Sequence, residues 1–166
     1  MKTFKAYGLE DVDPRGFVSL MDMYEINFIR FKKLTGNIDS LKKHSVSHVF
    51  GCLDLHLIVN ERSKYTTTLT LSYIFDDESG NVFEPDLKLR ICHDAQLIEV
   101  IAGHLKHGKQ RLDHVPADAL KLKWQLNRFL YKWLGYCLYL GHQFEVGSSP
   151  KTNNIYSKNT LSLPAA

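Results

Sequence analysis

Apolar and polar residues alternate in four stretches of the chain, and this period constrains the fold more than any other feature. The stretches cover residues 53–59, 65–73, 87–93 and 97–102. A period of two places successive side chains on opposite faces of a β-strand. The connections at 60–64, at 76–81 and near Asp94 are short, whereas a parallel pair needs a crossover of a dozen or more residues. The pattern therefore predicts a four-stranded antiparallel meander.

Stretches with helical periodicity flank the predicted strands. A helix is expected over residues 14–34, with Asp13 as its N-cap and Gly36 as its stop. A second helix is expected over residues 118–140, closed by Gly141. The apolar stripes consist of Phe17, Leu20, Met21, Tyr24, Phe28 and Phe31, and of Leu126, Phe129, Leu130, Trp133 and Cys137. Because each stripe needs an apolar surface to pack on, we expect an α+β fold with both helices on one face of the sheet.

Length and composition favour one globular domain. The chain has 166 residues, of which 44% are hydrophobic and 23% are charged. This balance suits a packed core. We expect a single domain over residues 1–146 and a disordered tail over residues 147–166, where Ser, Asn, Lys and Pro occur without periodicity.

Three features indicate a cytoplasmic protein that does not enter a membrane. No apolar stretch approaches the roughly 18 residues that a membrane-spanning helix needs. The first residues are basic but lack the apolar run and cleavage site of a secretory signal. Cys52, Cys92 and Cys137 are an odd number without a Cys-x-x-Cys pair, which favours reduced thiols and a reducing compartment.

The predicted sheet has one apolar face and one polar face. The polar face carries Thr66, Thr68, Thr70, Lys88 and Arg90. An antiparallel sheet can leave such a face in water. The face is therefore either simply solvated or available for binding.

Four groups of residues form a recognisable set. They are Leu20, Met21, Tyr24, Glu25 and Asn27; Lys64, Tyr65, Thr66 and Thr67; Leu89, Arg90, Ile91, His93, Asp94, Ala95, Glu99 and Val100; and residues 125–130 with Trp133, Leu134 and residues 136–138. In order and spacing, over roughly residues 18–142, this set resembles the YqiB-like family of uncharacterised proteobacterial proteins. The resemblance implies a cytoplasmic bacterial protein and implies no activity. Before the last helix, members of that family tend to carry a Pro-Asn loop and an Asp-Glu-Lys start, whereas residues 107–111 here are His-Gly-Lys-Gln-Arg and Asp118 precedes Ala-Leu-Lys.

The candidate ligand site lies at the ends of the predicted strands. Cations and hydroxyls at a strand entrance can jointly hold an anion, and the segment His93-Asp94-Ala95 adds polar groups. The residues of this hypothesis are Arg62, Lys64, Thr66, Arg90, His93, Asp94 and Glu99. The alternatives are structural, because a threonine-rich strand is simply a good strand and the Asp94 side chain can fix a turn by accepting backbone N–H groups.

The consecutive residues Cys92, His93 and Asp94 invite a nucleophile hypothesis. Neighbouring side chains on a strand point to opposite faces, so the thiol and the imidazole are expected to diverge. We therefore assign no catalytic residue. A hydrolase built on His93, Asp94 and Glu99 is the last of three functional hypotheses.

His44 and His48 are four residues apart, which places both on one face of a helix or a strand, as metal ligands require. Two ligands do not make a site. The sequence therefore predicts no metal and no cofactor.

Basic residues gather around the segment before the last helix. The loop expected over residues 103–117 contains Lys106, Lys109 and Arg111, and Arg128 lies on the polar side of the helix. A continuous cationic strip would attract phosphate groups, and its binding would weaken with salt. The alternative is an ordinary solvated surface.

The leading functional hypothesis is a non-enzymatic binding or adaptor protein that engages a protein partner through the exposed sheet face and its basic borders. The alternative is a binder of RNA or of a phosphorylated small molecule through the basic loop and the last helix. No acid, base and nucleophile converge at a spacing that would predict catalysis.

Overall fold

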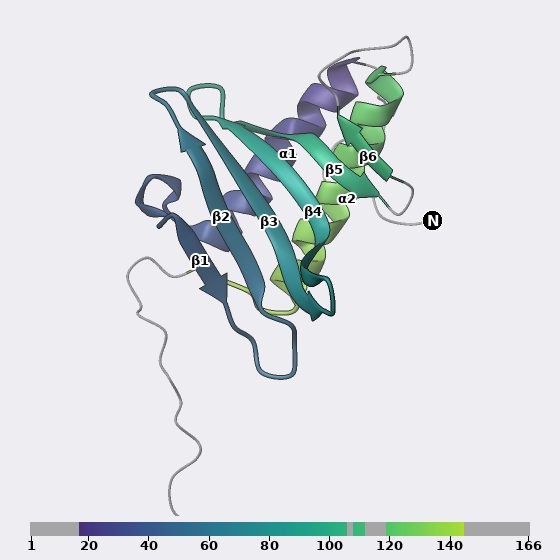
Figure 1. Cartoon of the computed structure of the whole chain (residues 1–166). Coiled ribbons are helices and arrows are strands. Elements are labelled where there is room, and N and C mark those ends of the chain that lie inside the picture. The colour runs from purple at the N-terminus through teal and green to yellow at the C-terminus, as the bar shows by residue number, and fades with distance from the viewer. Residues whose placement is uncertain (1–16, 106–107, 112–118, 145–166) are drawn as a thin grey trace, which may run out of the picture.

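The computed structural model describes residues 17–105, 108–111 and 119–144, and it has the predicted α+β architecture (Figure 1). In chain order the elements are α1 (Phe17–Thr35), the 3₁₀-helix η2 (Ile38–Ser40), β1 (His44–Ser47), β2 (Leu55–Arg62), β3 (Thr66–Asp77), β4 (Gly80–Cys92), β5 (Leu97–Leu105), β6 (Gly108–Arg111) and α2 (Ala119–Tyr139). The predicted helix starts near Asp13 and Asp118 and the predicted tail over 147–166 lie outside the described residues.

The strands form one antiparallel meander in the order β1-β2-β3-β4-β5-β6. The predicted meander is confirmed, but the predicted number of four strands is wrong. Two four-residue strands extend the sheet at its edges: β1 pairs with β2, and β6 pairs with β5. Their sequences, His-Ser-Val-Ser and Gly-Lys-Gln-Arg, lack the apolar alternation that marks a half-buried strand. Part of the loop predicted over 103–117 is therefore the end of β5 followed by β6.

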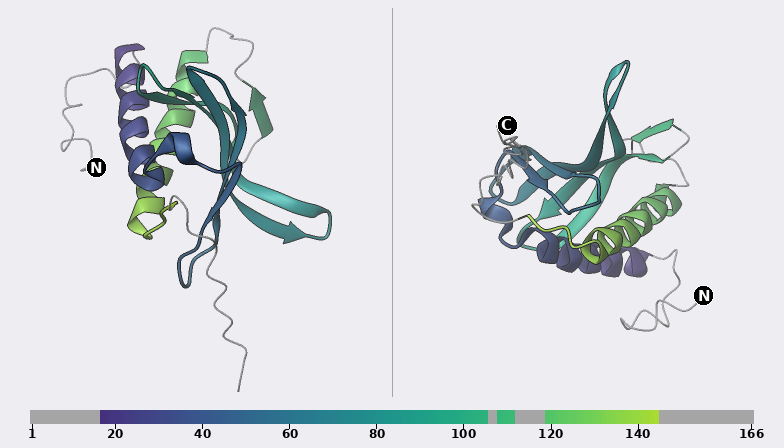
Figure 2. Two further views of the ribbon diagram at one scale, coloured as in Figure 1. Left: turned by 90° about the vertical axis from the view of Figure 1, so that its left-hand side faces the viewer. Right: turned by 90° about the horizontal axis from the view of Figure 1, so that it is seen from below.

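Both helices cover the same face of the sheet (Figure 2). The core between them contains Phe28, Phe31 and Leu34 of α1; Leu55, Leu57, Val59, Leu69, Leu71, Leu87, Leu89, Ile91, Ile98 and Val100 of the strands; and Leu126, Leu130, Trp133, Leu134 and Cys137 of α2. The predicted stops are confirmed. Gly36 and Gly141 have φ values of 66° and 87°, a conformation that glycine adopts without the strain of a Cβ atom.

Helix α2 covers the edge of β5 at Val100, just before the residues of β5 that pair with β6. The fully buried Asn127 accepts the Val100 N–H at its Oδ1 (3.0 Å) and donates from Nδ2 to the Lys123 carbonyl (2.8 Å). Asn27 of α1 donates to the Asn127 carbonyl (3.0 Å). Two amide side chains therefore link α1, α2 and the sheet, and that of Asn127 satisfies an N–H that would otherwise lack a partner.

Strands β3 and β4 continue beyond their neighbours as a two-stranded arm. Pairing of β3 with β2 ends at Tyr73, and pairing of β4 with β5 begins at Leu87. Residues 74–86, called the arm below, project away from the helices (Figure 2). The turn predicted over 76–81 is therefore shorter than expected, because Asp76 and Asp77 still pair with Asn81 and Gly80. No helix of the described chain is both long and apolar enough to cross a bilayer.

Candidate functional site

The face of the sheet opposite the helices, called the open face below, is built on a register that aligns threonines with cations. Thr70 lies opposite Lys88, and Thr68 lies opposite Arg90. The two threonines are partly exposed, and the two cations are exposed. Because directly opposed residues of an antiparallel pair project to the same face, hydroxyls and cations share one surface here, as the sequence predicts.

Arg90 is held in place by an acidic neighbour on β5. Arg90 Nε donates to Glu99 Oε1 at 2.8 Å, and Nη2 contacts the same oxygen. The Arg90 side chain is 46% exposed, whereas that of Glu99 is 13% exposed. The hydrogen bond to Glu99 raises the pKa of Arg90 above its ordinary value. Among the described residues Nη1 makes no hydrogen bond, so the fixed guanidinium still offers donors to a partner.

Both helices contribute support to Glu99 from the side. Lys123 Nζ of α2 lies 3.8 Å from Glu99 Oε2. Burial raises the pKa of Tyr24 on α1, and the charge of Glu99 and a hydrogen bond to it raise that pKa further. Arg90, Glu99, Tyr24 and Lys123 thus form one polar cluster at the β5 edge. The sequence predicts Arg90 and Glu99 as site residues but not Tyr24 and Lys123, because nothing in their spacing shows that the helices reach this edge.

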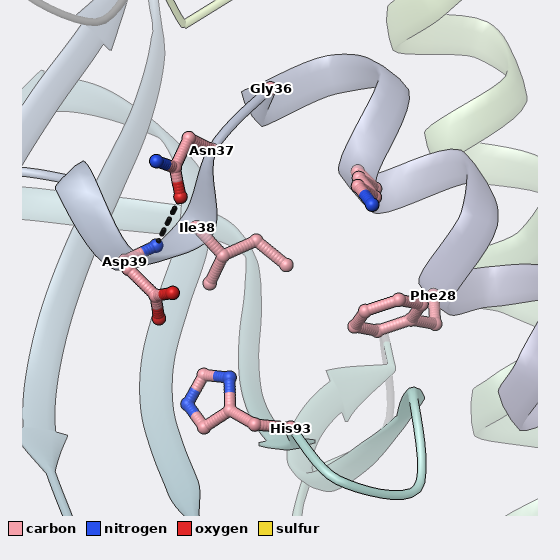
Figure 3. A pocket seen from close by; sticks show the side chains of 7 residues that line it. Phe28, Gly36, Asn37, Ile38, Asp39 and His93 are labelled. Atoms are coloured by element: carbon pink, nitrogen blue, oxygen red, sulfur yellow. Dashed lines mark hydrogen bonds between the residues drawn. The ribbon is translucent and has the colours of Figure 1, made fainter.

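His93 lies in a different place, in a pocket of about 570 Å³ between the end of α1, η2 and the turn after β4 (Figure 3). The pocket is lined by Phe28, Lys32, Gly36, Asn37, Ile38, Asp39 and His93. His93 Nε2 and Thr67 Oγ1 are 2.8 Å apart, and the His93 N–H donates to the Tyr65 carbonyl. Lys32, Asp39 and His93 give this pocket a cation, a carboxylate and an imidazole for a small polar ligand. Phe28 and Ile38 supply its apolar lining.

The remaining predicted ligand residues are dispersed. Arg62 donates to the carbonyls of Ile38, Asp39 and Leu41 at 2.7–3.3 Å, so it stabilises the segment around η2. The Lys64 ammonium lies 5.0 Å from the ring centre of the exposed Tyr65.

Thr66 and Asp94 make local hydrogen bonds. The Thr66 and Ser63 hydroxyls are 2.7 Å apart, and Asp94 Oδ1 accepts the Ala95 N–H at 2.9 Å. Of the seven predicted residues, only Arg90 and Glu99 are joined by a side-chain hydrogen bond. The Asp94 contact matches the structural alternative that the sequence left open.

The structure does not assemble a hydrolase from His93, Asp94 and Glu99, because each is bonded to a different partner. Cys92 lies opposite Thr66, whereas the His93 side chain bonds to Thr67, which points to the other face of β3. Burial raises the pKa of the Cys92 thiol, and the charge of Arg90 lowers it only in part. A raised pKa disfavours the thiolate that a nucleophile requires.

The exposed histidines also pair separately. His44 Nε2 and His56 Nδ1 are 3.0 Å apart with stacked rings, while His48 contacts Asp54. Burial lowers the pKa of His56, and the charge of His44 lowers it further. Within the part of the chain that the structure describes, no group of three His, Cys, Asp or Glu residues could hold a metal ion.

The predicted basic strip falls partly outside the described residues, since Lys106 is not among them. Lys109 and Arg111 belong to β6, opposite His104 and Ala102 of β5. Ala102 in turn lies opposite Lys88, so β5 separates the backbone of β6 from the cations of β4. Arg128 of α2 is partly buried.

The fold and its polar face define a class of protein, a small antiparallel α+β domain with helices on one side and a hydroxyl-rich face that carries Lys88 and Arg90 on the other. The chain belongs to the family described as "Protein of unknown function (DUF1249)", which matches residues 30–143. It is 30% identical over 126 residues to "Uncharacterized protein YqiB" of Escherichia coli K12, covering 74% of this chain and 88% of that protein. The YqiB proteins of strains CFT073 and O157:H7 match equally. No solved structure matches the chain.

Proposed function

We propose that this chain is a non-enzymatic, cytoplasmic binding protein that engages a protein partner through the open face of its sheet. The observation that carries the proposal is the placement of α1 and α2 on a single face (Figure 2). On the other face Thr68 and Thr70 are partly exposed and Lys88 and Arg90 are exposed.

The rigidity of the open face supports this role. Its side chains project from paired strands, and Glu99 fixes Arg90. Asn60 Nδ2 lies 3.3 Å from the Thr70 hydroxyl, which itself donates to Asn60 Oδ1 at 3.0 Å. A preorganised surface loses less conformational entropy on binding. Thr66, Arg90 and Lys64 of the predicted ligand set belong to this face or its border.

The composition of the open face favours a protein over single-stranded RNA. RNA-binding sheets stack bases on aromatic side chains in the middle of their strands. At the corresponding centre this sheet carries Thr68, Thr70 and Arg90. The exposed Tyr65 precedes β3 and lies under Lys64.

Binding of RNA or of a phosphorylated small molecule is the second candidate, and the position of β6 favours it. Lys109 and Arg111 lie on β6, and Arg111 is aligned across β5 with Lys88 because both are opposite Ala102. An electrophoretic mobility shift that weakens with salt, and that is lost when Lys109 and Arg111 are replaced by alanine, is the expected result for this candidate. Unchanged affinity in that variant would remove it.

Affinity purification with the full chain as bait tests the leading proposal. Thr68→Arg and Lys88→Glu alter the open face, and Lys33→Glu makes the same charge change at an exposed position on α1. We expect a protein that is recovered by the wild type and by Lys33→Glu but reduced at least tenfold with the two open-face variants, because a clash or reversed charge in an interface typically weakens binding by this much. Equal recovery with all three variants would contradict the proposal.

A further inference from the structure

The arm over residues 74–86 exposes apolar side chains far from the core. Phe75 lies opposite Val82 and Ile74 lies opposite Phe83, so each face of the arm carries one apolar pair. Phe75, Val82 and Phe83 are 37%, 38% and 37% exposed. A two-stranded ribbon is marginally stable in isolation, and its apolar surface gains from contact with another chain.

Both outer edges of the arm lack a neighbouring strand within the described chain. The last residue of β3 that pairs with β2 is Tyr73, and the first residue of β4 that pairs with β5 is Leu87. Over residues 74–86, the backbone N–H and C=O groups on the outer edges of the arm therefore have no partner strand within the described chain. An unpaired edge is a template on which an extended segment of another chain can add as a strand.

The charge of the arm is entirely negative. Its charged residues are Asp76, Asp77, Glu78, Glu84 and Asp86, and it contains no Lys, Arg or His. The arm thus holds five of the 18 acidic residues of a chain with a net charge of +3. Of these five, Asp76, Asp77, Glu78 and Glu84 are exposed.

We propose that the arm binds an extended segment of a partner protein in which apolar residues alternate with Lys or Arg, and that this segment adds as a strand to one edge of the arm. An alternating strand places its apolar residues on one face of the arm, beside Phe75 and Val82 or beside Ile74 and Phe83. Its cations then lie on the other face, which carries Asp76 in the first case and Asp77 in the second. The charge also decides against a second copy as the occupant. Two arms paired edge to edge would bring like charges together, which is unfavourable.

The test measures the binding of fluorescent peptides of about eight residues, a common strand length, to the full chain by anisotropy. We expect a peptide of alternating Val and Lys to bind, and its affinity to fall by about tenfold in the triple variant Asp76→Asn, Asp77→Asn and Glu78→Gln. The double variant Phe75→Ser, Phe83→Ser should bind the same peptide more weakly. The open-face variant Lys88→Glu should leave it unchanged, which separates this site from the open face.

Three control peptides separate strand addition from simple charge attraction. A peptide with the same composition but separate Lys and Val blocks should bind at least tenfold more weakly, as should one N-methylated at alternate residues and one with Glu in place of Lys. Equal binding of the block or N-methylated peptide would overturn the proposal. A wild-type dimer in sedimentation that dissociates in the Phe75→Ser, Phe83→Ser variant would also overturn it, because the occupant would then be a second copy.

Discussion

Replacing Asn127 with leucine is expected to destabilise the chain by about 2 kcal/mol. The substitution keeps the branched arrangement of side-chain heavy atoms but removes the oxygen that accepts the Val100 N–H at 3.0 Å. Both residues are fully buried, so that N–H is left without an acceptor, at a cost of about 1–3 kcal/mol. The Lys123 carbonyl also loses a hydrogen bond, with a smaller effect because carbonyls in a helix already accept from the main chain.

Asn27→Leu is the matched control on the other helix. Asn27 is equally buried, and its Oδ1 has no hydrogen-bond partner among the described residues. Its removal leaves no backbone N–H without an acceptor, so the expected cost is below about 1 kcal/mol.

Urea denaturation followed by circular dichroism measures both changes, and a constant m-value shows that the unfolding reaction is the same. For a chain of this size, about 2 kcal/mol corresponds to a fall in Tm of about 4–8 °C. If the two variants were equally destabilised, or if Asn127→Leu were neutral, the link between α2 and the β5 edge would not have the role described.

Three further predictions concern single groups. Glu99→Gln should bring the pKa of Tyr24 down toward its ordinary value, since the carboxylate adds to the effect of burial; ultraviolet titration of the phenol measures the change. Burial lowers the pKa of His142 from 6.5, so the unfolded chain binds the proton more tightly and the free energy of unfolding should fall as pH drops from 7 toward 5. His142→Gln should reduce that slope in urea titrations at several pH values. Gly103→Ala should lower stability by about 1–2 kcal/mol in urea, because the new Cβ would lie 3.0 Å and 3.3 Å from two buried leucine methyl groups.

The sequence predicts the helices and inner strands well because their signals are local. Alternation in strands and stop glycines such as Gly36 depend on a few adjacent residues. The edge strand β1 carries no such signal. Its buried Ser47 bonds to residues far along the chain: His142 Nδ1 lies 3.1 Å from the hydroxyl, and the Gln143 N–H donates to it at 2.9 Å.

The residues of the candidate ligand set lie apart because of structural features that sequence spacing does not reveal. A register shift between Val59 and Glu61 changes the side to which Arg62 points, so that it lies opposite the buried Thr67 and reaches η2. His93 follows the last residue of β4 and bonds to Thr67 on the helix side. Arg90 and Glu99 meet because they are cross-strand neighbours, a register that antiparallel pairing alone does not specify.

Photo-crosslinking in living cells gives the sharpest test of the open face as a binding surface. A photoreactive residue is placed at Lys88 on the open face or at Lys33 on α1, two exposed lysines on opposite sides of the fold. We expect a discrete crosslinked protein from position 88 that is absent from position 33. The same crosslinks from both positions, or crosslinks from position 33 alone, would contradict the assignment of the open face as the partner-binding surface.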